Sequence, residues 1–264
     1  MSAIAASVRK VLPPIRTGTD RDRSIRSAAV VAGISLLVMT ALAVFANFVV
    51  LEALVTPGDA ARTATDLLAS KGLFQLGIIG WILIATLDVI VAWALFRVFR
   101  PVSQRLAIAA AFARVIYTAI LGFAIIQLVE ALRLLNDQAS SVATSAASQG
   151  QVLQEVEAFN DVYDAGLLLF GIHLMLIGYL AYRSGYVSKI VGALVGIAGV
   201  GYVFDSVAVA LSLNLSFEIS VVTGMGELVL AFWLVIRGRR VSLPESEEVL
   251  GPLPAFGGAL TTGA

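Results

Sequence analysis

The stretch "LDVIVAWALFRVFRPVSQRLAIAAAFARVIY" (87–117) decides the fold, because it joins two apolar runs through a short basic turn. Each run forms part of a segment long enough to cross about 30 Å of hydrocarbon as a helix. Asp88 lies nine residues before Arg97 in the first run, and Arg114 lies nine residues after Arg105 in the second. This matched spacing predicts an antiparallel helical hairpin in which the acid and the base meet at the same depth.

The composition of the whole chain is typical of a membrane protein. Its 264 residues are 59% hydrophobic and 14% charged, whereas soluble domains have roughly 25% charged residues. The chain has no cysteine, and His173 is its one histidine, so thiolate and multi-histidine metal sites are excluded. We therefore expect no resident metal and no cofactor. The 18 acidic and 18 basic residues balance, so membrane lipid is the expected partner and nucleic acid is not.

Six runs of about 20 apolar residues are long enough to be transmembrane helices. Lipid offers no partner for backbone amides, and the runs are too long and too evenly apolar for barrel strands. The expected fold class is an all-α, polytopic membrane helical bundle with six transmembrane helices. Its spans are approximately residues 27–50, 73–96, 105–129, 162–182, 187–211 and 219–236. They form a transmembrane domain (27–237) between a basic N-terminal tail (1–26) and a disordered C-terminal tail (238–264).

The basic residues predict the orientation of these spans. Fourteen of the 18 precede the first span, follow the sixth, or lie in the second-to-third and fourth-to-fifth connections. The other connections hold only Arg62, Lys71 and Arg133, and Arg114 lies inside a span. Cytoplasmic loops of membrane proteins are enriched in Lys and Arg. Both termini are therefore expected in the cytoplasm, with the chain in the inner (plasma) membrane.

Four of the spans each carry one polar residue at a similar depth. Counted from the arginine at the cytoplasmic end of its span, each residue lies about 13–15 Å deep. Charges at such depths cost about 2.5–3.5 kcal/mol each, so these side chains should face the bundle interior and find partners. The expected buried polar cluster consists of Asp88, Arg114, His173 and Glu227.

Two interpretations of this cluster belong to different classes of function. In the first, Asp88 and Arg114 form a buried ion pair that fixes the register of two helices in a structural or regulatory protein. His173 and Glu227 are then further hydrogen-bond partners. In the second, Asp88 neutralises Arg114, and the remaining carboxylate of Glu227, beside the imidazole, handles a small solute, an ion or a proton. A water-accessible cavity that reaches Glu227 would favour the second interpretation.

A second polar set lies toward the opposite surface and raises a third interpretation, an intramembrane enzyme. Two of its aspartates occur in "VYDAG" (162–166) and "VFDSV" (203–207). These faintly resemble intramembrane aspartyl proteases but lack their Gly-x-Gly-Asp motif. Motifs of serine hydrolases, zinc proteases and phosphate-binding loops do not occur, so the sequence favours a protein that is not an enzyme and names no catalytic residue. The outer polar set consists of Asp164, Tyr202, Asp205, Gln127 and Glu130.

Two further patterns concern local structure. The segment "TPGDAARTATDLLASKG" (56–72) combines a Pro-Gly turn with Asp59 at the start of a short helix, expected along the outer surface. Gly192 and Gly196 are four residues apart and form a close-packing face. We expect this face to pack within the chain, although it could also join two copies as an oligomer.

Five segments spread along the chain carry a family resemblance: "TPGDA" (56–60), "FRPVSQRLAIAAAFAR" (99–114), "GLLLFGIHLMLIGYLAYRSGY" (166–186), "GYVFDSVAV" (201–209) and "GELVLAFWLVIRG" (226–238). In this order they resemble the signature segments of a bacterial membrane-protein family called domain of unknown function 4386, over about residues 23–240. The chain departs from the family at Ser188, since it reads "RSGYVSK" where the family usually has "RSGYLP". The resemblance implies a six-helix integral membrane protein and brings no established reaction, ligand or catalytic residue.

Overall fold

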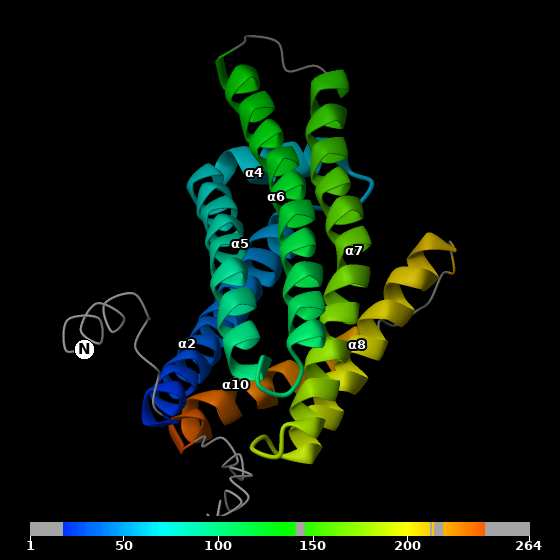
Figure 1. Cartoon of the computed structure of the whole chain (residues 1–264). Helices are drawn as coiled ribbons and strands as arrows, with labels where there is room; N and C mark the ends of the chain where they lie inside the picture. Colours follow the sequence, from blue (N-terminus) through cyan, green and yellow to red (C-terminus); the bar gives the residue numbers. More distant parts are fainter. Residues whose placement is uncertain (1–17, 141–145, 212, 214–218, 241–264) are drawn as a thin grey trace, which may run out of the picture.

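The computed structural model describes residues 18–140, 146–211, 213 and 219–240 of the chain (Figure 1). Every regular element in these ranges is a helix, so the predicted all-α fold is confirmed. The elements in chain order are α2 (Gly18–Val44), η1 (Phe45–Leu51), α3 (Glu52–Leu54), α4 (Ala60–Ala69), α5 (Lys71–Phe99), α6 (Gln104–Ser140), α7 (Ala146–Arg183), α8 (Lys189–Ala210), α9 (Ile219–Thr223), α10 (Met225–Arg237) and η2 (Gly238–Arg240).

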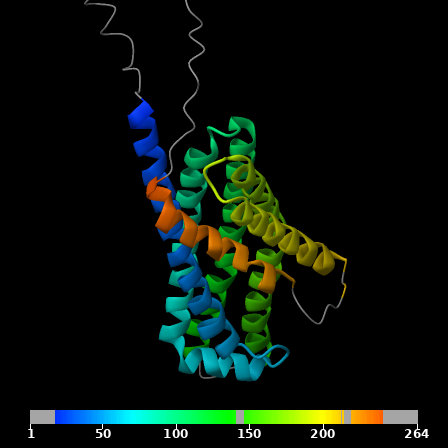
Figure 2. The ribbon, with the colours of Figure 1, turned by 90° about the horizontal axis from the view of Figure 1, so that it is seen from below.

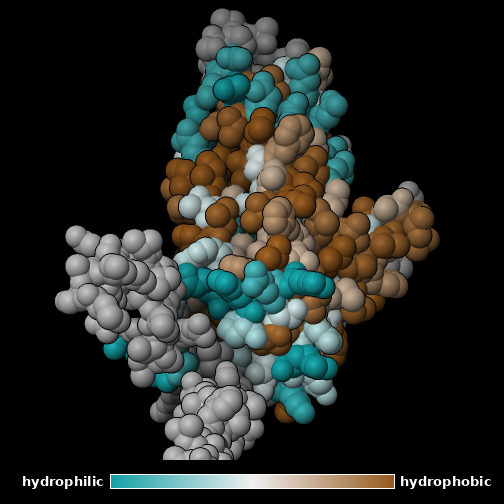
Figure 3. Space-filling view, in the orientation of Figure 1, coloured by the Kyte–Doolittle hydropathy of each residue, from teal (hydrophilic) through white to brown (hydrophobic). Residues whose placement is uncertain are grey.

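Within the described residues, five helical segments are long and apolar enough to cross a membrane, which is consistent with a membrane location. Apolar side chains cover the middle of the surface in Figure 3, and polar side chains gather above and below them. The predicted sixth span forms two shorter helices, α9 and α10, separated by Gly224. The sixth crossing therefore stays a prediction. The five segments are Asp22–Leu54, Lys71–Phe99, Gln104–Asp137, Ala146–Arg183 and Lys189–Ala210.

The helices pack as a bundle whose last members lean away from the others (Figures 1 and 2). α5, α6 and α7 stand side by side, with α6 packed on both of its neighbours. α8 packs on α7, and α10 crosses both α2 and α8. The start of α2 and the end of α10 lie at one end of the bundle, and α4 lies across the opposite end. We call the end of the bundle at which α4 lies the α4 end.

Several helices extend beyond the predicted spans. α6 continues to Ser140 and α7 begins at Ala146, so each adds at least ten residues to the span predicted from its apolar run. A hydropathy scan finds only the part of a helix that dissolves in lipid, whereas backbone hydrogen bonds continue the helix into polar sequence. α2 likewise begins at Gly18, inside the predicted N-terminal tail. Residues 1–17 and 241–264 of the predicted tails lie outside the described residues.

The helix at the α4 end forms as its sequence predicts. The carboxylate of Asp59 accepts a hydrogen bond from the backbone N–H of Arg62 at 3.0 Å and so caps the first turn of α4. Gly58 has a φ of +74°, a conformation that glycine adopts without steric cost. The predicted turn and short helix are therefore confirmed, and α4 packs on α7.

The "RSGY" segment makes the turn between α7 and α8 without the proline common in the family. Gly185 has a φ of +73°, and the hydroxyl of Ser184 accepts a hydrogen bond from the N–H of Val187 at 3.0 Å. The hydroxyl of Tyr186 donates to the backbone carbonyl of Val98 on α5 at 2.6 Å. Burial raises the pKa of this Tyr186 phenol above its usual range. The tyrosine thereby ties the turn to the base of α5.

Glycines bring α7 and α8 into backbone contact. A Cβ atom on Gly199 would lie 2.6 Å from the carbonyl oxygen of Gly171, and one on Gly192 would lie 2.5 Å from the nitrogen of Tyr182. A Cβ atom on Gly178 would clash with Gly196. Gly192 and the backbone of Gly196 thus pack against α7, whereas a Cβ atom on Gly196 itself would meet no described atom within 4 Å. An oligomer through this face stays a prediction.

Candidate functional site

The α5–α6 hairpin brings Asp88 and Arg114 together in the interior of the bundle. The Nε atom of Arg114 donates to Oδ1 of Asp88 at 2.7 Å, and Nη2 lies 2.6 Å from the same oxygen. Both side chains are 0% exposed. The pairing predicted from the matched spacing is therefore present in the structure.

His173 of α7 adds a third member to this pair. Its Nε2 atom lies 3.1 Å from Nη1 of Arg114, and its Nδ1 atom lies 2.8 Å from the carbonyl oxygen of Ala110. A carbonyl oxygen can only accept and a guanidinium can only donate. The proton must therefore be on Nδ1 and the lone pair on Nε2, which makes His173 a neutral imidazole with both nitrogens used. We call Asp88, Arg114 and His173 the buried triad.

Further contacts hold the arginine of the buried triad in place. Its Cζ atom lies 5.3 Å from the centre of the Phe170 ring, a distance at which a cation is attracted to an aromatic face. The hydroxyl of Thr118 donates to the backbone carbonyl of Arg114 at 2.8 Å. The guanidinium is thus fixed by side chains from α5 and α7, so the triad joins three helices.

Glu227 lies near the buried triad without being part of its hydrogen bonding. It sits in the first turn of α10, and its Oε1 atom is 3.9 Å from Nη1 of Arg114, which is too long for a hydrogen bond. Its side chain is 21% exposed. Within the described part of the chain, its carboxylate accepts no hydrogen bond. The four residues predicted to cluster are therefore close together: hydrogen bonds join three of them, and Glu227 is at ion-pair distance from Arg114.

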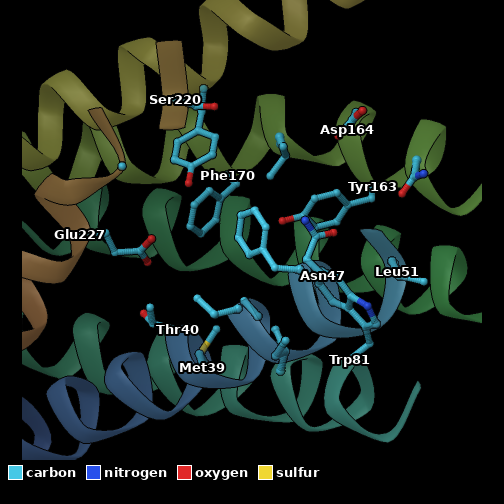
Figure 4. A pocket seen from close by; sticks show the side chains of 18 of the residues that line it. Met39, Thr40, Asn47, Leu51, Trp81, Tyr163, Asp164, Phe170, Ser220 and Glu227 are labelled. Atoms are coloured by element: carbon cyan, nitrogen blue, oxygen red, sulfur yellow. The ribbon is translucent and has the colours of Figure 1, made fainter. Parts of the chain in front are cut away.

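A groove with a volume of about 730 Å³ leads to these residues. One wall comes from α2 and η1 and the other from α7, and in the described residues these two walls do not pack against each other. Glu227 enters the groove from α10, as Figure 4 shows. We call this space the α2–α7 groove. The residues that line its polar parts are Thr40, Asn47, Glu52, Trp81, Asp88, Arg114, Tyr117, Asn160, Tyr163, Asp164, Tyr202, Ser220 and Glu227.

Three buried polar atoms in the lining of the groove have no hydrogen-bond partner in the described residues. They are Nε1 of Trp81, Oδ2 of Asp88 and Nη2 of Arg114. Nη2 of Arg114 forms an ion pair with Asp88, but the geometry is not that of a hydrogen bond. A buried polar atom without a partner costs about 1–3 kcal/mol. All three atoms are shielded from the groove by their neighbours, so this cost is a feature of the interior behind the groove wall.

The outer polar set divides between the groove and the loops. Asp164 and Tyr202 line the α2–α7 groove. The two carboxylate oxygens of Asp205 instead accept hydrogen bonds from the backbone N–H groups of Ile219 at 3.1 Å and Ser220 at 2.6 Å. Asp205 therefore caps the start of α9, and both of its oxygens have structural partners.

The remaining members of the outer polar set lie apart from the groove. Glu130 pairs with Arg133 on the surface of α6 at 3.2 Å, and Gln127 is half-buried on the same helix. The structure thus does not bring the five residues into one site. Over the residues that the structure describes, no group of three or more His, Asp or Glu side chains could hold a metal ion.

Several groove residues could not be found by counting charges along the spans. Asn47 belongs to η1, a π-helix of seven residues inside the first apolar run, and its amide donates to Glu52 at 3.1 Å. π-Helices are rare and occur often at functional sites. The sequence did contain a signal for this site, because Asn47 is a polar residue within a run of apolar ones. Trp81 and Tyr163 gave none, since aromatic residues are common in any membrane helix.

The chain has a relative of known sequence. It is 36% identical over 165 residues to an uncharacterized protein of Archaeoglobus fulgidus, and the matched region covers 62% of this chain and 85% of the relative. No solved structure matches the chain. The segments that carried the family resemblance fall within residues 31–238, which match the family described as Domain of unknown function (DUF4386). The chain therefore belongs to this family.

Proposed function

We propose that this protein handles a small solute, an ion or a proton in the α2–α7 groove, with Glu227 as the group that binds it. The observation that carries the proposal is the groove itself, about 730 Å³ in volume, which reaches Glu227. The carboxylate of Glu227 is partly exposed, and the half-buried Thr40 and Asn47 add polar side chains to the lining. Ligand sites are concave and largely apolar, with a few convergent polar groups. The groove fits this description.

The division of the polar cluster supports a role for Glu227 beyond structure. Asp88, Arg114 and His173 bond to one another and join α5, α6 and α7. A purely structural cluster would use its last carboxylate in the same network. Glu227 instead stands at ion-pair distance from Arg114, 3.9 Å, without a hydrogen bond, and its side chain is partly exposed, which supports a role in binding.

The proposal includes a multi-pass topology in the inner membrane with six crossings and both termini in the cytoplasm. In this topology α9 and α10 together make the sixth crossing, interrupted at Gly224. The start of α2 and the end of α10 lie at the same end of the bundle, as an even number of crossings requires. Interrupted helices near the middle of the membrane are typical of ligand sites in transporters.

The test is a comparison of Glu227→Gln with a matched control, Glu130→Gln, which removes a surface carboxylate of α6. Each purified protein is reconstituted into liposomes that contain a pH-sensitive dye, and proton flux is measured with sodium, potassium or magnesium gradients. Thermal unfolding in detergent is measured with the same ions. We expect a response in the wild type and in Glu130→Gln that Glu227→Gln lacks.

The alternative is a structural or regulatory protein in which the cluster only joins helices, and the buried triad is the observation that favours it. In that case the wild type and Glu227→Gln give identical fluxes and identical ion effects on unfolding. Such a result, together with no binding of an organic cation that depends on Glu227, would refute the proposal. The enzyme alternative has less support, because both carboxylate oxygens of Asp205 are used by the backbone of α9.

A further inference from the structure

The charges that line the α2–α7 groove favour a cationic ligand. Arg114 is the one basic residue among the described residues of the lining, and its guanidinium is already bound by Asp88 and His173. Four acidic residues share the lining with it. An anion would therefore meet excess negative charge, whereas a cation would be attracted. The acidic residues are Glu52, Asp88, Asp164 and Glu227.

Aromatic rings supply much of the remaining wall. Phe170 lies beside both Tyr117 and Tyr202, with ring centres 5.0 and 5.2 Å away, and Trp81 lies 5.3 Å from Tyr163. All five of these residues line the groove. The face of an aromatic ring carries negative partial charge and attracts cations, especially those that are weakly hydrated. An aromatic wall beside a carboxylate is therefore suited to an organic cation.

The same features do not suit a bare metal ion. Calcium takes six to eight oxygen ligands, and magnesium requires a regular octahedron, yet the described residues hold no group of three or more acidic or histidine side chains close enough for a metal. The volume of about 730 Å³ is that of a site for an organic molecule. Leu36, Met39 and Leu51 from α2 and η1 add an apolar surface for its body.

We propose that the α2–α7 groove binds an organic cation, a substituted ammonium with an apolar body, whose charge lies at Glu227 and whose body lies against the aromatic wall. This inference rests on the proposed function and names its ligand class. Figure 4 shows the arrangement: the Glu227 carboxylate is at one end of the groove, with Phe170 beside it and Tyr163 and Trp81 farther along.

The test uses Trp81 as a reporter, because its indole is 2% exposed and lines the groove. The other two tryptophans, Trp93 and Trp233, are replaced by phenylalanine, so that the emission comes from Trp81 alone. The protein in detergent is titrated with benzyltrimethylammonium and, separately, with neopentylbenzene, which has the same shape without the charge. We expect a saturable change in Trp81 emission with the cation only.

Three variants in this background show where the cation binds. Glu227→Gln should weaken binding of benzyltrimethylammonium about tenfold or more, since it removes a charge beside a partly desolvated cation. Glu130→Gln should bind as the parent does. Thermal unfolding of each variant without ligand establishes that it is folded, and Phe170→Leu provides a second variant that weakens binding through the aromatic wall instead of the charge.

The outcomes separate this inference from the proposed function. The proposal of an organic cation is overturned if the charged and the neutral compound bind equally. It is also overturned if Glu227→Gln binds benzyltrimethylammonium as the parent does. If sodium, potassium, magnesium or protons act through Glu227 while benzyltrimethylammonium does not bind, the proposed function stands and the ligand class is wrong. If no ion and no organic cation gives a response that depends on Glu227, both are wrong.

Discussion

Arg114 donates to Nε2 of His173 at 3.1 Å while Nδ1 of the same ring contacts the carbonyl oxygen of Ala110 at 2.8 Å. The histidine thus accepts a hydrogen bond on one side and donates its own proton on the other. Its imidazole is neutral and has no nitrogen left for a ligand. This relationship makes His173 a residue that positions Arg114, and Glu227 is the member of the cluster whose side chain is partly exposed.

Loss of His173 should therefore destabilise the fold. His173→Leu leaves Nη1 of Arg114 and the carbonyl of Ala110 without these partners in the interior, and each such group costs about 1–3 kcal/mol. We expect the free energy of unfolding in detergent to fall by about 2–4 kcal/mol. A change near zero would mean that the imidazole is not held by these two bonds.

Asp88 and Arg114 should behave as a pair in a double-mutant cycle. Removing one partner of a buried ion pair typically costs about 3–5 kcal/mol, because it leaves an uncompensated charge. Asp88→Asn and Arg114→Gln should each lower the stability by an amount of this order, and the double variant should lose less than the sum. The surface pair Glu130 and Arg133 is the control, with an expected effect of about 0–1 kcal/mol. Additive losses at Asp88 and Arg114 would contradict the pairing.

Glu227→Gln should separate binding from stability. The carboxylate accepts no hydrogen bond within the described residues and stands 3.9 Å from Arg114, so the isosteric amide should change the free energy of unfolding by about 1 kcal/mol or less. Asp88→Asn should be clearly less stable when both variants are unfolded under the same conditions. If Glu227→Gln is as unstable as Asp88→Asn, Glu227 belongs to the structural network instead.

Replacing a glycine by alanine should destabilise the protein where α7 and α8 are in contact, but not where the glycine faces open space. A Cβ atom on Gly199 would lie 2.6 Å from both the carbonyl oxygen of Gly171 and the nitrogen of Met175, and backbone atoms cannot turn aside. Gly199→Ala should therefore cost about 1–3 kcal/mol. Gly122→Ala on α6 is the control, because a Cβ atom on Gly122 would meet no described atom within 4 Å; we expect it to be neutral or slightly stabilising. Equal effects would mean that α7 and α8 are not in close contact.

Reporter fusions test the topology independently of the groove. A reporter fused after Arg240 should be cytoplasmic, and one fused after Arg133 should lie on the other side of the membrane. The end of α10 and the end of α6 lie at opposite ends of the bundle in Figure 1. Reporters on the same side would overturn the six crossings.

Sequence reasoning worked best where the geometry is local. The short turn after α5 forces an antiparallel neighbour, so counting nine residues in each direction was enough to pair Asp88 with Arg114. Depth alone also brought His173 and Glu227 to the same level. It could not say which of them would bond to the arginine, because that depends on the rotation and tilt of α7 and α10.

The groove could not be predicted because it exists where two helices fail to pack. Thr40 on α2 and Asn160 on α7 become neighbours of one cavity only through the arrangement of the helices between them. For Asp205, the sequence suggested a functional role that the structure does not support. Its depth suggested a partner for Asp164 in catalysis, but the connection after α8 returns the start of α9 to its carboxylate, where it acts as a cap.

The close crossing of α8 and α10 has a consequence for the electrostatics of the groove. Gly226 lies directly against the backbone of Leu194, so the residue beside Glu227 is fixed by contact between two helices. The carboxylate is therefore positioned by its neighbour in the chain, not by hydrogen bonds of its own. This contact predicts that Glu227→Gln removes the charge at this end of the groove while the backbone around it keeps its shape.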